Sequence, residues 1–152
     1  MSNTQAMCTS FMEQLLTGTH NFTTGTGDTF KAALYLASAT VNASTTVYSS
    51  TGEVTGTNYS PGGVTVTNGT SPSSTNTSAT AGTAYWTPSA SITYTNVTLT
   101  TAFDAVLIYN SSKSDKAVSV HTFGSQTVTA GTFTLTMPSN TTSTALIRLA
   151  TT

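Results

Sequence analysis

The most constraining feature of this sequence is a hydrophobic period of two that begins at Phe30 and recurs through the rest of the chain. In the first such stretch, Phe30, Ala32, Leu34 and Leu36 alternate with other residues. Successive side chains of a β-strand point to opposite faces of its sheet, so this alternation predicts a strand with one core face. Similar short stretches follow, separated by turn signals. We therefore expect roughly eight to ten strands in an all-β fold, an antiparallel sandwich or jelly-roll-like domain.

The segment 103–109 is apolar at nearly every position, which is typical of a central strand covered on both faces. A hydrophilic turn at 110–116 separates it from a second alternating stretch at 117–123. Together they predict a hairpin at the centre of the domain. A last pair of strands is expected from the apolar residues around Phe133 and around Ile147.

The alternation changes phase once, inside the stretch that precedes this hairpin. Ile92 and Tyr94 share one phase, whereas Val97 and Leu99 lie on the other. One additional residue in a strand shifts the following side chains in this way, so the sequence predicts a bulge or bend near Asn96.

A different period, that of an α-helix, occurs only near the N-terminus. The apolar residues with this spacing are Cys8, Phe11, Met12, Leu15 and Leu16. Gly18 supplies a stop signal, so we expect an N-terminal helical segment at 1–20 and a β-sandwich domain at 21–152. A short apolar helix ahead of a β domain can pack against a neighbouring subunit. Phe11, Met12, Leu15 and Leu16 are therefore candidate assembly contacts.

The segment 68–82 consists almost entirely of small and polar residues, and we interpret it as an exposed loop of the β domain. Tyr85 and Trp86 follow it and are candidate contacts for a partner or a glycan. Aromatic residues at strand spacing are more often core residues or cross-strand pairs, which is the alternative interpretation for both.

Charged residues make up 6% of the chain, four basic and five acidic. More than a third of the residues are Thr or Ser, so the surface is polar without being charged. A protein that binds phosphates or anionic lipids needs clustered Lys or Arg, and none are clustered here. We expect no nucleic-acid partner and no membrane partner.

Residues able to carry chemistry are few. The chain has two histidines, His20 and His121, and one cysteine, Cys8, on the apolar helical face. Asp104 interrupts the most apolar strand, and we expect it to cap a turn or to pair with a cation such as Arg148. The sequence contains no phosphate-binding loop, no metal-ligand spacing and no nucleophile motif, so we expect no enzymatic activity, no cofactor and no metal.

Several segments, taken in order, resemble a family of small structural proteins of tailed-bacteriophage virions. They are TFKAALY at 29–35, TGEVTGTNYSPGG at 51–63, AVLIYN at 105–110, VTAGTFTL at 128–135 and LIRLA at 146–150. The opening at 11–20 and the stretch 116–124 fit the same pattern, so the resemblance covers nearly the whole chain except the segment 68–85.

This resemblance implies a component of the virion, assembled after synthesis in the host cytoplasm, and it carries no catalytic residues. Size, neutral surface and N-terminal helix favour a homo-oligomeric capsid decoration or cement protein that stabilises the head by binding the major capsid protein or other virion subunits. The alternative is a tail or neck component, including a tail-fibre or adhesin module.

Overall fold

The computed structural model describes residues 2–75 and 82–151, and in them the chain forms two antiparallel β-sheets and one short helix. The large sheet has the strand order β1-β7-β6-β2-β3, and the small sheet has the order β4-β5-β8. The predicted all-β class with a short N-terminal helix is confirmed. The elements are β1 (Ala6–Met7), α1 (Thr9–Leu16), β2 (Phe30–Leu36), β3 (Val64–Thr65), β4 (Ser73–Ser74), β5 (Thr83–Trp86), β6 (Ile92–Asn110), β7 (Lys116–Leu135) and β8 (Ile147–Ala150).

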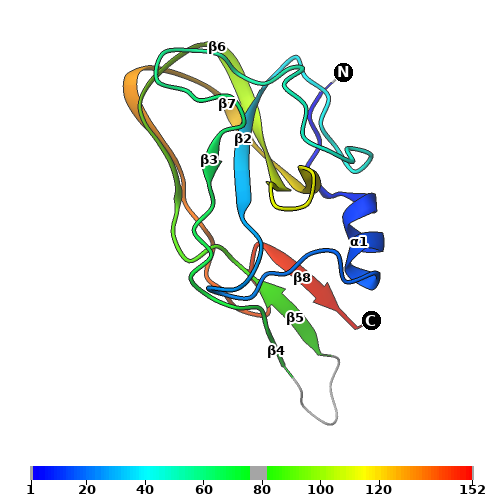
Figure 1. Ribbon diagram of the computed structural model, residues 1–152. Helices are drawn as coiled ribbons and strands as arrows, with labels where there is room; N and C mark the ends of the chain where they lie inside the picture. Colours follow the sequence, from blue (N-terminus) through cyan, green and yellow to red (C-terminus); the bar gives the residue numbers. More distant parts are fainter. Residues whose placement is uncertain (1, 76–81, 152) are drawn as a thin grey trace.

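The core is built on the hairpin of β6 and β7, which is flanked by β2 in the large sheet (Figure 1). β6 is the middle strand, and every residue from Ala105 to Asn110 is buried. The continuous apolar run at 103–109 therefore lies at the centre of the sheet, as predicted. The hairpin turn at 111–115 also lies where the hydrophilic segment predicted it.

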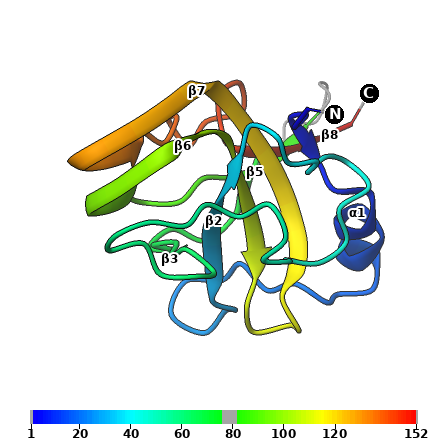
Figure 2. The same ribbon diagram turned by 90° about the horizontal axis from the view of Figure 1, so that it is seen from above.

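The ribbon of β6 and β7 bends strongly along its length (Figures 1 and 2). Its free ends therefore return over the large sheet, where the Tyr94 hydroxyl donates to the carbonyl of Ala32 at 2.8 Å and the rings of Phe103 and Phe133 lie 5.0 Å apart. The register between the two strands shifts between Tyr94 and Val97, and Asn96 has a positive φ of 52°. Because of this irregularity, Tyr94 and Val97 are both buried although they lie on opposite phases of the alternation. The bulge predicted near Asn96 is confirmed.

The N-terminal segment belongs to the same core as the strands. β1 pairs with β7, and Cys8 and Phe11 are fully buried. The Asn3 amide donates a 2.6 Å hydrogen bond to Asp104 and accepts one of 3.0 Å from the Val41 amide. Within the N-terminal helical segment expected at 1–20, the described residues thus pack on the strands of the β domain.

Asp104 and Arg148 do not pair, which corrects that expectation. The Asp104 carboxylate accepts its hydrogen bond from Asn3, while the Arg148 guanidinium donates to the carbonyl of Ser143 at 2.9 Å. The salt bridge found among the described residues is between Lys113 and Asp28, with 3.6 Å between nitrogen and oxygen.

The predicted loop at 68–82 is partly a strand. Ser73 and Ser74 form β4, an exposed edge strand that pairs with Tyr85 and Ala84 of β5. The pairing needs only main-chain hydrogen bonds, so a segment without apolar side chains can enter a sheet edge. Residues 76–81 of this segment lie outside the described residues.

Candidate functional site

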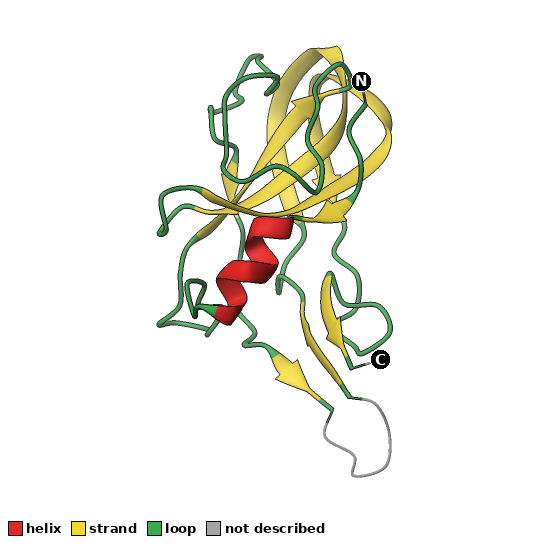
Figure 3. Ribbon diagram, turned by 90° about the vertical axis from the view of Figure 1, so that its right-hand side faces the viewer, coloured by secondary structure: helices red, strands yellow, loops and turns green. Residues whose placement is uncertain are grey.

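An apolar cleft is lined by residues of α1 and of the small sheet. These two elements lie below the large sheet in the views of Figures 1 and 3. The cavity volume of the cleft is about 100 Å³. The residues that line it come from five segments of the chain: Phe11, Leu15, Phe22, Pro72, Ala84, Tyr85, Trp86, Ile147 and Leu149. None of these side chains is charged, so the cleft can accept apolar groups.

The helix contributes one wall because two of its apolar residues face inward. Phe11 is fully buried and Leu15 is half-buried, and both line the cleft. Met12 is 45% exposed and Leu16 is 90% exposed. These two side chains therefore remain available to a partner, whereas Phe11 is held by the chain's own core, which corrects its assignment as an assembly contact.

The opposite wall is formed by β5 and β8, which pair with Tyr85 opposite Arg148 and Trp86 opposite Ile147. Trp86 is only 2% exposed, and its indole N–H donates to Asn68 and to the carbonyl of Thr70, both at 3.1 Å. A side chain fixed in this way cannot stack on a ligand in solvent. The interpretation of Trp86 as a glycan contact is corrected, and Tyr85, half-buried at the cleft, is the member of the pair that a partner can reach.

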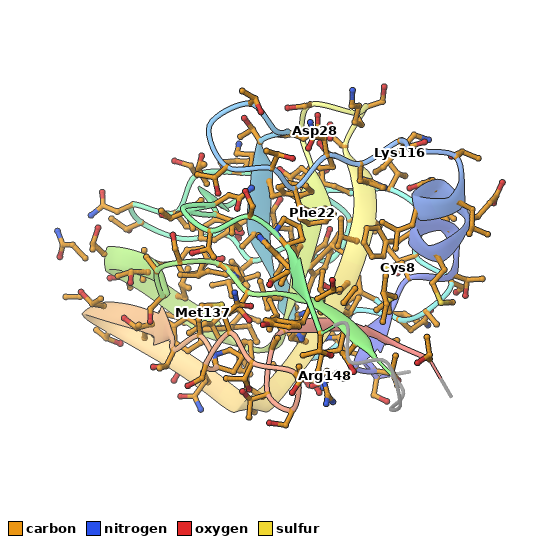
Figure 4. All side chains as sticks on the ribbon, turned by 90° about the horizontal axis from the view of Figure 1, so that it is seen from below. Cys8, Phe22, Asp28, Lys116, Met137 and Arg148 are labelled. Atoms are coloured by element: carbon orange, nitrogen blue, oxygen red, sulfur yellow. The ribbon has the colours of Figure 1, made fainter. Side chains whose placement is uncertain are left out.

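The floor of the cleft is a cluster of aromatic rings around Phe22, which lies in the interior of the molecule (Figure 4). The ring of Phe22 stacks on Phe30 with centroids 4.3 Å apart, and it meets Trp86 edge-on at 4.8 Å. Phe11 and His20 complete the cluster, with their centroids 5.0 Å apart. Such pairs add to the area-dependent stabilisation and fix the ring orientations.

The structure thus brings together two sets of residues that the sequence placed far apart, Phe11 and Leu15 on the helix and Tyr85 and Trp86 on β5. Sequence reasoning missed Phe22 and Pro72, which lie in Thr- and Gly-rich stretches without periodicity. For the β8 residues Ile147 and Leu149, the alternation of apolar residues did predict a strand. The alternation could not indicate that this strand would pair with β5.

Outside the cleft, two reactive side chains meet at the contact between Ser119 and His121, whose Oγ and Nε2 atoms are 2.9 Å apart. Ser119 is 3% exposed, and burial lowers the pKa of His121 to about 4. No carboxylate orients this imidazole among the described residues, and no metal-binding group of His, Cys, Asp or Glu is found there. This pair therefore lacks the arrangement of a catalytic triad.

Cys8 is also unsuited to nucleophilic chemistry, because burial raises the pKa of its thiol to about 11. The thiolate is the nucleophilic form, and it is scarce at neutral pH when the pKa is this high. Cys8 instead serves as the residue before α1, where its carbonyl accepts hydrogen bonds from the amides of Phe11 and Met12.

Comparison of the chain with known protein families, with curated proteins and with solved structures gives no match. Within residues 2–75 and 82–151, no helix has the length and apolarity to cross a membrane.

Proposed function

We propose that this chain is a structural protein of a tailed-bacteriophage virion, a decoration or cement subunit that binds the major capsid protein. The observation that carries the proposal is the apolar cleft with exposed leucines beside it. Leu149, which lines one wall, is 43% exposed. Leu16, which follows the wall residue Leu15 on α1, is 90% exposed. Exposed apolar side chains next to an apolar cleft favour a protein–protein contact.

The resemblance of the sequence to small virion proteins supports the same proposal, and so does the scarcity of charge. A homo-oligomer that binds several identical sites on a particle at the same time can hold its position through weak individual contacts. Such an oligomer needs no charged steering surface, in agreement with a net charge of −1. Its partners are then the major capsid protein or further copies of itself.

The alternative function is a tail or neck component, which the resemblance supports equally. Within this alternative, the burial of Trp86 disfavours an adhesin module that binds host glycans through this ring. An aromatic platform for sugars requires an exposed ring face, and the Trp86 ring is buried at 2% exposure.

Quantitative mass spectrometry of purified particles, with heads separated from tails, tests the proposal. We expect this chain on heads, in copy numbers on the order of hundreds, as a decorating subunit requires. Recovery on tails in a few to a few dozen copies per particle would overturn the decoration role and support the tail or neck alternative.

Adding purified variants to heads that lack the protein tests the surface itself. Leu16→Ser and Leu149→Ser should each reduce co-sedimentation with heads about tenfold, since they remove apolar contacts at the interface. Val47→Ser is the matched control, because Val47 is 46% exposed and neither it nor a residue next to it in the sequence lines the cleft. Normal binding by both leucine variants, or loss of binding by the control alone, would contradict the assignment of this surface.

A further inference from the structure

A continuous chain of hydrogen bonds joins the helix α1 to the end of strand β6 through His20. The His20 Nε2 atom lies 2.7 Å from Oε1 of Gln14, which is on α1. Its Nδ1 atom lies 2.9 Å from the side-chain nitrogen of Asn110, the last residue of β6. The same Asn110 nitrogen donates to Oδ2 of Asp28 at 2.8 Å.

The orientation of Asn110 is fixed by its other partners. Its amide nitrogen faces the Asp28 carboxylate, and its Oδ1 accepts a hydrogen bond of 3.1 Å from the main-chain N–H of Ser112. Turning the amide over would place its oxygen against a carboxylate and its N–H groups against another donor. Asn110 therefore donates to His20, because both of its amide protons have an acceptor only in this orientation.

This arrangement determines the proton on His20. Since Nδ1 accepts from Asn110, the ring proton of the neutral imidazole is on Nε2, where it donates to Gln14. A second proton would have to bind at Nδ1, and it would point at the N–H of Asn110. The charged ring thus loses the hydrogen bond to β6 and gains a repulsive contact in its place.

Three charged groups surround His20. Asp28, from the segment that follows it, favours the charged ring, whereas Lys113 and Lys116, from the end of the hairpin, oppose it. Asp28 and Lys116 lie at the same edge of the molecule (Figure 4). Burial has the largest effect and lowers the pKa of His20 below its ordinary value of 6.5.

The ring also contacts the cleft. Its centroid lies 5.0 Å from that of Phe11 and 6.4 Å from that of Phe22, and both phenylalanines line the cleft. We propose that His20 is a pH-sensitive lock, whose protonation below neutral pH releases the C-terminal half of α1 from the end of β6 and loosens this wall of the cleft. This proposal concerns contacts within the chain, so it does not depend on which partner binds at the cleft.

Two measurements on the full-length chain test the lock. Nitrogen NMR of the His20 ring should show the Nε2–H tautomer at neutral pH and a titration midpoint below 6.5. Hydrogen exchange of the α1 amides, corrected for the intrinsic rate, should accelerate between about pH 7.5 and about pH 5. Linkage predicts an acceleration of up to about tenfold for each unit by which the measured pKa lies below that of an exposed histidine.

The two histidines allow a matched comparison. His121→Gln should retain the acceleration in α1, whereas His20→Gln should abolish the pH dependence. The proposal is overturned by the Nδ1–H tautomer at neutral pH, by a His20 pKa at or above 6.5, or by α1 exchange that does not change with pH in the wild-type chain. Equal acceleration in all segments would also overturn it, because that result indicates global acid unfolding. If His20→Gln does not fold, the proposal is still tested in the wild-type chain by the tautomer of His20 and by the hydrogen exchange of the α1 amides.

Discussion

The hydroxyl of Tyr59 donates a 2.7 Å hydrogen bond to Oε1 of Glu53, and both side chains are buried, with exposures of 8% and 6%. Tyr48 donates to the other carboxylate oxygen at 2.6 Å, and the main-chain N–H of Gly62 donates to Oε1 at 2.8 Å. Tyr59 in turn accepts a hydrogen bond from the main-chain N–H of Leu34 in β2. The hydrogen bonds of the Glu53 carboxylate therefore link the segment 48–62 to β2 of the large sheet.

Replacing Glu53 should destabilise the fold. Glu53→Ala leaves three donors without an acceptor, two of them buried, and should lower the free energy of unfolding by about 3 kcal/mol or more. Glu53→Gln retains one carbonyl oxygen and should lower it by about 1 to 2 kcal/mol. Urea denaturation measures both values, with the exposed Glu13→Gln as the control that leaves stability unchanged. Equal stability of all three variants would show that the network is not structural.

The buried tyrosines should make the protein sensitive to alkaline pH. Burial raises the pKa of Tyr35 and of Tyr109 to about 12 from the ordinary value of 10, and it also raises the pKa of Tyr59 and Tyr94. Above pH 10 the unfolded chain releases these protons while the folded chain retains them. The stabilisation is therefore complete below about pH 10 and is lost as the pH rises toward 12.

Circular dichroism during an alkaline titration, recorded together with tyrosinate absorbance, checks this expectation. Unfolding and tyrosine ionisation should occur together. Tyr35→Phe should be less stable at neutral pH, because it loses the hydrogen bond to Ser49, but its stability should fall less steeply with pH. Ionisation of all tyrosines near pH 10 without unfolding would contradict the burial of these rings.

Substitutions at two apolar residues of α1 should differ greatly in their effect on stability. Phe11 is fully buried, so Phe11→Ala should lower the free energy of unfolding by about 3 to 5 kcal/mol. Leu16 is 90% exposed, so Leu16→Ala should change it by less than about 0.5 kcal/mol. Chemical denaturation distinguishes them. A small effect of Phe11→Ala would mean that the helix is not part of the core.

Two glycines provide a similar comparison for the main chain. Gly63 has a φ of 72°, and a Cβ there would collide with the carbonyl of Ala32 in β2. Gly124 has open space around its Cα and an ordinary φ. Gly63→Ala should therefore cost more than about 2 kcal/mol, whereas Gly124→Ala should be neutral or slightly stabilising. Thermal unfolding of both variants measures the difference, and equal melting temperatures would refute the close approach at Gly63.

The sequence determined the central strands of this protein and the position of its centre. Alternation alone located β2 and the buried part of β6, because a strand with one or two core faces must place apolar residues at every second or every position. The phase change located the bulge at Asn96 for the same reason. The helical spacing of the apolar residues also predicted the helix near the N-terminus, although the sequence did not determine the residue at which it begins, Thr9.

Only the tertiary structure decided which of these residues share a site. Periodicity specifies the face on which a side chain lies but not the element that covers it, so it could not reveal that Phe11 and Trp86 line one cleft. The burial of Glu53 and the contact between His20 and Asn110 depend on residues 6 to 90 positions apart in the sequence. Such contacts form only when the sheet brings these segments together, because no local pattern encodes a partner at that distance.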